Sequence, residues 1–263
     1  NQAVAQRATR AYYLSESGVR IASSVHRAAV AAGTANSVLP ALHNKTFKLQ
    51  DNVSSFTLSV YPYWLYAKDA YSAGTNSIML YLPGALPKRD NTDTAIVFPT
   101  GFADTLYLRI KDARSATWAG STFVPYSSAA AGTFAAGYGT PVSFNLAETF
   151  SSDIAAGDEF YIGYLVTQNS TQAGNDLSIF MADTNMPYMF PPQQGTVIVV
   201  KSTIAYYKYD LRIVDSTVSP VKVTLTNIKN LDGTSAAPNI LIGNQVYAGK
   251  SVGFRSTSTY GGE

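Results

Sequence analysis

The sequence predicts an α+β protein in which a long N-terminal helix precedes a large antiparallel, β-rich head of sandwich or barrel type. Three observations support this prediction. Apolar residues within the first 32 positions recur with helical spacing, and from about residue 46 they alternate with polar residues in short runs. Clusters of Gly, Pro, Asn and Asp separate these runs, and no helical pattern lies between them. A parallel sheet with crossover helices is therefore not expected.

Residues 1–32 are expected to form one helix. Its apolar seam, interrupted only at Arg7, repeats every three or four residues, at Val4, Ala11, Leu14, Gly18, Ile21, Val25, Ala28 and Ala32. A stripe of small residues lies beside it, at Ala8, Ala11, Ser15, Gly18 and Ala22. Gly33 is placed to cap the helix, and Pro40 prevents its simple continuation. The chain begins inside this pattern, so we expect it to belong to a longer helix.

Gly18 costs the helix about 1 kcal/mol relative to alanine, so a packing contact should require it. One interpretation is that small residues let helices of different subunits approach closely. The contact would then comprise Ala11, Leu14, Gly18, Ile21, Ala22 and Val25. The other interpretation is that the helix lies on a sheet of its own molecule, with Gly18 making room for an aromatic ring. The residues alone favour neither.

The remainder of the chain is expected to consist of short strands. The alternating runs are "SFTLSVYP", "SIMLYL", "DTLYLRI", "VSFNL", "EFYIGYLV", "TVIVVK", "IAYYKYDLRIV" and "VKVTLT". The small-residue stretch 127–139 is a loop or a short helix. These patterns divide the chain into a helix with its linker, 1–45, and a head, 46–263, in which 75–195 is a candidate inserted β module.

Composition excludes several classes of function. Of the 263 residues, 14% are charged and the formal net charge is +2, which gives no reason to expect nucleic acid as a partner. The chain has no cysteine, so disulfides, thiolate metal sites and thiol nucleophiles are excluded. No apolar stretch reaches the roughly 18 residues that a membrane span needs.

The residues that could carry catalysis are few. Only His26 and His43 could serve as imidazole bases, and both are expected at surface or cap positions. Asp90, Asp93 and Asp183 lie in loops, where turn formation explains them more simply than Ca²⁺ binding does. No nucleophile elbow or phosphate-binding loop is present. We expect no enzymatic activity, no cofactor and no metal; a hydrolase with a remote carboxylate pair is a distant alternative.

Tyrosine is abundant, with 18 copies, and Tyr206, Tyr207 and Tyr209 lie close together in "AYYKYD". Exposed rings of this kind could contact a glycan, so these three residues are candidate surface contacts. The simpler interpretation, which we favour, is that tyrosine fills a sheet face by burying its ring.

The segment "AYYLSESGVRIA", 11–22, resembles bacterial type IV pilin-like proteins, particularly minor pilins and pseudopilins. In that family an aromatic pair, Leu, a small residue, Glu, a small residue, Gly and an aliphatic residue follow the membrane-spanning half of the N-terminal helix. The matching positions here are Tyr12, Tyr13, Leu14, Ser15, Glu16, Ser17, Gly18 and Val19. The ending "STSTYGG", 256–262, is similar to a strand start in these proteins, although Ser258 stands where Gly is usual.

The resemblance implies a subunit that is held in the inner membrane before assembly, through an apolar half-helix that this sequence does not contain. After export it would pack through its helix against copies of itself or related pilin subunits in an extracellular filament, with the β-rich part outside. The alternative is a surface adhesin or glycan-binding β module without a role in a filament.

Overall fold

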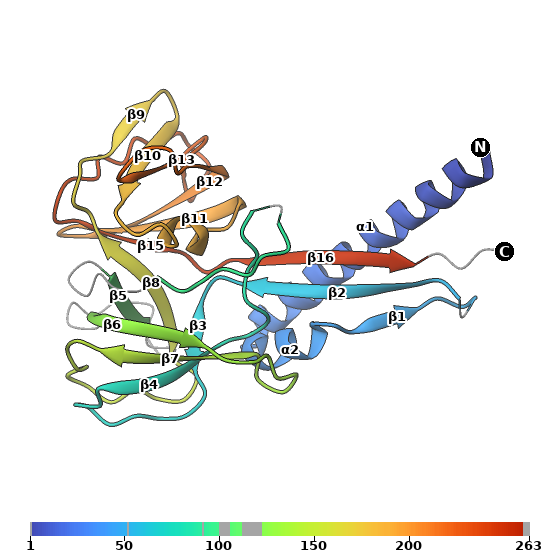
Figure 1. Ribbon diagram of the computed structural model, residues 1–263, viewed down its shortest axis with the longest axis horizontal. Helices are drawn as coiled ribbons and strands as arrows, with labels where there is room; N and C mark the ends of the chain where they lie inside the picture. Colours follow the sequence, from blue (N-terminus) through green and yellow to red (C-terminus); the bar gives the residue numbers. More distant parts are fainter. Residues whose placement is uncertain (1, 52, 91, 100–105, 112–122, 260–263) are drawn as a thin grey trace.

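The structure is a computed structural model that describes residues 2–51, 53–90, 92–99, 106–111 and 123–259, with backbone only for Ala3, 106–111 and Phe123. It consists of a head and a stalk that projects from one side of it (Figure 1). We use "stalk" for helix α1 with the small sheet β1-β2-β16, and "head" for strands β3 to β15. The start of α1 and the end of β16 lie at the far end of the stalk (Figure 1). The α+β class, with a long N-terminal helix and a large antiparallel sheet, is therefore confirmed.

The stalk joins the first residues of the chain to the last. Its elements, with the short helix that follows α1, are α1 (Gln2–Ala31), α2 (Ala35–Leu42), β1 (Thr46–Lys48), β2 (Ser55–Pro62) and β16 (Val252–Thr259). Strand β16 is antiparallel to β2 over its whole length, from the pair Val252–Pro62 to the pair Thr259–Ser55. Gly33 adopts a φ of 69° immediately after α1, which is the left-handed conformation expected of a helix-capping glycine. The helix α2 was not predicted.

The head is built almost wholly from antiparallel strands. They are β3 (Leu65–Ala67), β4 (Ser77–Leu82), β5 (Leu106–Lys111), β6 (Phe123–Ala131), β7 (Thr140–Leu146), β8 (Glu159–Leu165), β9 (Thr171–Ala173), β10 (Asp176–Met181), β11 (Gln193–Val200), β12 (Ile204–Asp215), β13 (Val221–Leu225), β14 (Lys229–Asn230) and β15 (Gln245–Ala248), with a 3₁₀ turn, η1 (Met186–Met189), before β11.

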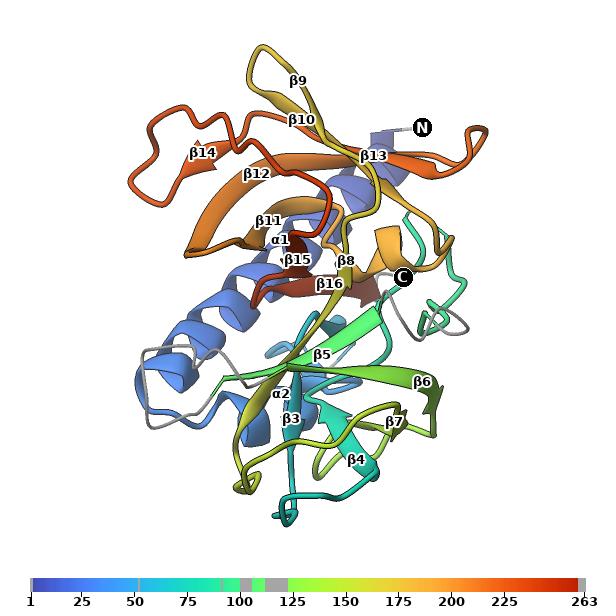
Figure 2. The same ribbon diagram turned by 90° about the vertical axis from the view of Figure 1, so that its left-hand side faces the viewer.

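The head sheet follows the order β3-β4-β7-β6-β5-β8-β15-β11-β12-β13-β10-β9, with β14 beside β12. Strand β8 runs between two groups of strands, β3 to β7 on one side and β9 to β15 on the other (Figure 2). Its first residues also pair with β3, so the pairings of the first group return to their starting strand. The sheet as a whole does not close. Residues 75–195 contribute strands to both groups.

Alternation explains most of these strands. In β2, Phe56, Leu58 and Val60 point inward and are buried, while the residues between them are half-buried. One prediction was wrong: in the stretch 127–139, residues up to Ala131 continue β6 and are neither loop nor helix. The small side chains of this stretch show no alternation of apolar and polar residues, so the sequence did not distinguish a strand from a loop or a helix. Residues 104–105 of the predicted run "DTLYLRI" lie outside the described residues.

Candidate functional site

Helix α1 packs on the stalk sheet through Gly18. A Cβ atom at this position would lie 2.7 Å from Phe56 Cδ2 and would overlap the hydroxyl of Ser256. Two side-chain hydrogen bonds flank this contact. Ser15 Oγ donates to the carbonyl oxygen of Ser256 at 2.6 Å, and Ser258 Oγ donates to the carbonyl oxygen of Ala11 at 2.7 Å. The small residues of α1 thus let the helix approach the backbone of β16 closely.

The predicted helix-packing residues divide into two groups. Leu14, Gly18 and Ala22 are buried against the molecule's own sheet, and Ala11 and Val25 are half-buried. Assigning Leu14, Gly18 and Ala22 to a contact between subunits was therefore wrong, because β2 and β16 already cover them. The helical spacing fits a sheet as well as a second helix. The alternative interpretation, in which Gly18 makes room for an aromatic ring, describes the contact with Phe56.

The rest of α1 presents large apolar side chains to solvent. Among the predicted packing residues Ile21 is exposed, with an exposed fraction of 42%. Val4, Tyr12 and Tyr13 are exposed by 61–69%, and Gln2 and residues 4–10 are all exposed. In Figure 1 the first turns of α1 diverge from β16. We define the exposed helix side as Tyr12 and Tyr13, whose ring centroids are 5.8 Å apart. By helical spacing, Ile21 borders the packed stripe and Val4 continues it beyond the sheet.

The three candidate tyrosines of β12 do not form one surface. Tyr209 is 1% exposed, and its hydroxyl donates to the carbonyl oxygen of Pro191 at 2.8 Å. Tyr206 and Tyr207 are half-buried and contact different apolar clusters. Because successive residues of a strand point to opposite faces, Tyr206 lies on the face opposite Tyr207 and Tyr209. The prediction of Tyr209 as a surface contact was wrong, and for this residue the sheet-filling interpretation holds.

The two histidines are half-buried. The ring of His26 lies edge-on to Phe254, with 5.9 Å between ring centroids, and its Nε2 is buried without a hydrogen-bond partner among the described residues. Burial lowers the pKa of His26, and the nearby Lys250 lowers it further. His43 Nδ1 accepts the backbone N–H of Val60 at 3.0 Å, and burial lowers its pKa as well. Both imidazole rings are therefore packed against residues of the stalk sheet, His26 against Phe254 and His43 against the backbone of Val60.

The loop carboxylates have structural partners. Asp90 forms an ion pair with Arg212, whose side chain is 1% exposed and also donates to the carbonyl oxygen of Pro187 at 3.0 Å. Asp93 pairs with Arg255 at 2.8 Å. Asp183 accepts the backbone N–H groups of Asn185, just before η1, and of Met186, its first residue. Within the described part of the chain, no group of three or more potential ligands is placed to hold a metal ion.

A large cleft lies where the stalk meets the head. Its volume is about 1070 Å³, and it is lined by α1, β16, the start of β11 and the loop residues Lys88, Asp90 and Thr92. Four cationic side chains line it, Arg27, Lys88, Lys250 and Arg255, against the single carboxylate of Asp90. Lys250 lies over the ring of Trp64, 4.9 Å from its centroid. A cleft of this size and charge can accommodate an anionic partner.

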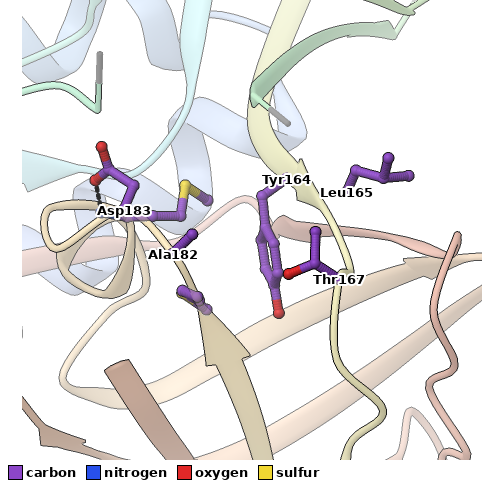
Figure 3. A pocket seen from close by; sticks show the side chains of 7 residues that line it. Tyr164, Leu165, Thr167, Ala182 and Asp183 are labelled. Carbon is purple, nitrogen blue, oxygen red and sulfur yellow. Dashed lines mark hydrogen bonds between the residues drawn. The ribbon is translucent and has the colours of Figure 1, made fainter. Parts of the chain in front are cut away.

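A second, small cavity lies inside the head. Figure 3 shows Tyr164, Thr167 and Ala182 around it. Its volume is about 10 Å³, which is enough for one water molecule at most. The hydroxyl of Tyr164 is buried and has no hydrogen-bond partner among the described residues. The cavity is therefore too small for a ligand larger than a water molecule.

Sequence reasoning missed the cleft. Its residues come from distant parts of the chain, so no local motif joins Arg27 to Lys88 or Lys250.

No helix in the described ranges combines the length and the apolarity needed to cross a bilayer. Comparison of the chain with protein-family models, curated proteins and solved structures found no match in any of the three. The resemblance of residues 12–19 to pilin-like proteins therefore stays a prediction.

Proposed function

We propose that the protein is a structural subunit of an extracellular, pilus-like filament at the bacterial surface. It packs against copies of itself or related subunits through the exposed helix side, while the head faces solvent. The single observation that carries this proposal is the exposure of Val4, Tyr12, Tyr13 and Ile21 on a helix that projects beyond its sheet. Large apolar side chains that lie together on a surface, as the rings of Tyr12 and Tyr13 do, mark interaction surfaces.

The stability of α1 supports the same proposal. In proteins most helical stability comes from the packing of one face, and helix ends without such packing fray. Residues 4–10 are exposed, so a neighbouring subunit would stabilise them. The buried stripe holds α1 against the stalk sheet, which leaves the opposite side of the helix for the neighbouring subunit.

The head fits an outward-facing position. We propose that its first group of strands has a barrel-like form, because β8 pairs with both β5 and β3. A ring of pairings leaves few open strand edges, and open edges promote aggregation on an exposed surface. The alternative role is that of a glycan-binding protein outside any filament. Tyr209 no longer supports it, because this side chain is buried.

Electron microscopy of the native host tests the proposal. The double variant Tyr12→Glu/Tyr13→Glu places two charges on the exposed helix side and should abolish filaments that contain the protein. The matched control, Val97→Glu/Leu231→Glu, places two charges at head positions that are 63% and 52% exposed and should leave filaments unchanged. Circular dichroism of both purified variants checks that each folds. Filaments of normal number in the helix variant would refute the proposal.

A further inference from the structure

The cleft runs along an unpaired strand edge. Among the described strands, β16 pairs only with β2. Val19 and Ser23 of α1 line the cleft on one face of β16, whereas Tyr61 and Tyr63 line it on the other. Because the lining residues come from both faces of the strand, the cleft borders its free edge.

The hydrogen-bond register identifies the backbone groups at this edge. The N–H of Tyr63 donates to the carbonyl oxygen of Ser251 at 2.9 Å. Since the direction of these groups alternates along an antiparallel strand, Gly253 and Arg255 also face β2. Val252 and Phe254 therefore point their N–H and C=O groups away from β2. On β2 the alternation agrees, because the N–H of Val60 is bonded to His43 on the side opposite β16.

The helix occupies only the outer part of this edge. Ser15 of α1 bonds the carbonyl oxygen of Ser256. For the outward N–H and C=O groups of Val252 and Phe254, the described residues provide no partner. Exposed backbone groups at a strand edge are a template for another strand.

The opposite wall of the cleft is also open. In β11, Val197 to Val200 pair with β15 on one side and with β12 on the other. Gln193 and Gly195 pair with β12, while β15 reaches no further than the bond from the N–H of Gly249 to Thr196 O, 2.8 Å long. Beyond Gly249 the chain leaves β11 and becomes β16, so the two strands diverge and leave space between them.

The charges around this space favour an acidic occupant. Lys250 is paired with Glu159, and Arg255 with Asp93. Arg27 and Lys88 have no carboxylate partner within the part of the chain that the structure describes. An occupant that carries carboxylates would pair with these two cations.

We propose that the cleft binds an extended, acidic polypeptide segment of a partner protein. The segment adds as a strand to the Val252–Phe254 edge of β16, and its carboxylates pair with Arg27 and Lys88. Main-chain hydrogen bonds then supply affinity and the charges supply selectivity, as in other cases of strand addition. This binding role goes beyond the proposed filament role and does not depend on it.

Selection from a displayed library of random octapeptides on the purified full chain tests the proposal. We expect the enriched peptides to be acidic, rich in β-branched residues and free of proline. Fluorescence anisotropy of an enriched peptide then measures its affinity for variants. Val252→Pro removes an outward N–H without touching the pairing with β2, and Arg27→Glu reverses one unpaired cation. Each should weaken binding by about tenfold or more.

Lys201→Glu serves as the matched control, because it changes the charge by the same amount outside the cleft. It should bind within about twofold of the wild type. If Val252→Pro does not fold, amide hydrogen exchange of Val252 and Phe254 with bound peptide replaces it, and exchange should slow. Failure to enrich acidic peptides, or unchanged affinity of Arg27→Glu, would overturn the proposal.

Discussion

Gly18 of α1 lies directly against the ring of Phe56 on β2, so closely that a Cβ atom at position 18 would be 2.7 Å from Phe56 Cδ2. This contact determines which side of α1 belongs to the molecule and which side is left for a neighbour. Glycine at this position lowers the intrinsic stability of the helix, and close packing of α1 on the sheet offsets that loss.

Replacing Gly18 with alanine should therefore destabilise the protein. In an open helix the substitution would stabilise by about 1 kcal/mol, but here the methyl group must displace Phe56 and Ser256. We expect a net loss of about 1–3 kcal/mol in the free energy of unfolding, measured by urea denaturation. Ser24→Ala, at an exposed position of α1, should stay within about 0.5 kcal/mol of the wild type. A Gly18→Ala protein more stable than the wild type would disprove the contact.

Asp90 should stabilise the fold through Arg212. The guanidinium of Arg212 is buried, so Asp90→Asn leaves its charge without a carboxylate. We expect a loss of about 3 kcal/mol in unfolding free energy. Asp210→Asn is the control, since Asp210 lies at 3.7 Å from Lys229 in an exposed pair, and it should cost less than about 1 kcal/mol. Equal effects of the two substitutions would contradict the assigned burial of Arg212.

Tyr209 should contribute through its hydroxyl as well as its ring. Tyr209→Phe removes the hydrogen bond to Pro191 and leaves a buried carbonyl oxygen without that donor. The expected loss in thermal or urea denaturation is about 1 kcal/mol. Tyr12→Phe, at a site 67% exposed, should change stability by less than about 0.5 kcal/mol. No difference between the two variants would place the Tyr209 hydroxyl in solvent.

Stability should fall on mild acidification because of His26. Burial lowers its pKa in the folded protein below the ordinary value of 6.5. As pH drops below about 6.5, the unfolded chain takes up a proton that the folded protein does not, so unfolding is favoured. Urea denaturation at pH 7.5 and 5.0 should show this loss, and His26→Gln should reduce it. His43→Gln should also reduce the loss of stability, since burial lowers the pKa of His43 as well. A loss that neither variant reduces would assign the effect to other groups.

The sequence was sufficient for the elements with a clear local period. Residues 1–32 and the run "SFTLSVYP" have periods near 3.6 and 2, and the structure has a helix and a strand there. The partner of α1 was not predictable, because a stripe of small residues fits a helix or a sheet. The burial of Tyr209 follows from strand alternation only once the buried face of β12 is known.

The cleft and the Asp90–Arg212 pair were beyond local reasoning. Asp90 and Arg212 are 122 positions apart, and the cleft joins α1 to β16 from opposite ends of the chain. The pairing of β16 with β2 brings the two ends of the chain together at the cleft. The free edge of β16 depends in the same way on which strands remain unpaired in the finished sheet.

Thiol accessibility on assembled protein tests the proposed packing of α1 most directly. The chain contains no cysteine, so a single introduced thiol reports one position. Tyr13→Cys should react quickly with a maleimide in the dissociated subunit and at least tenfold more slowly at the cell surface, whereas Val97→Cys in the head should react equally fast in both. Equal reactivity of Tyr13→Cys in the two states would contradict the account.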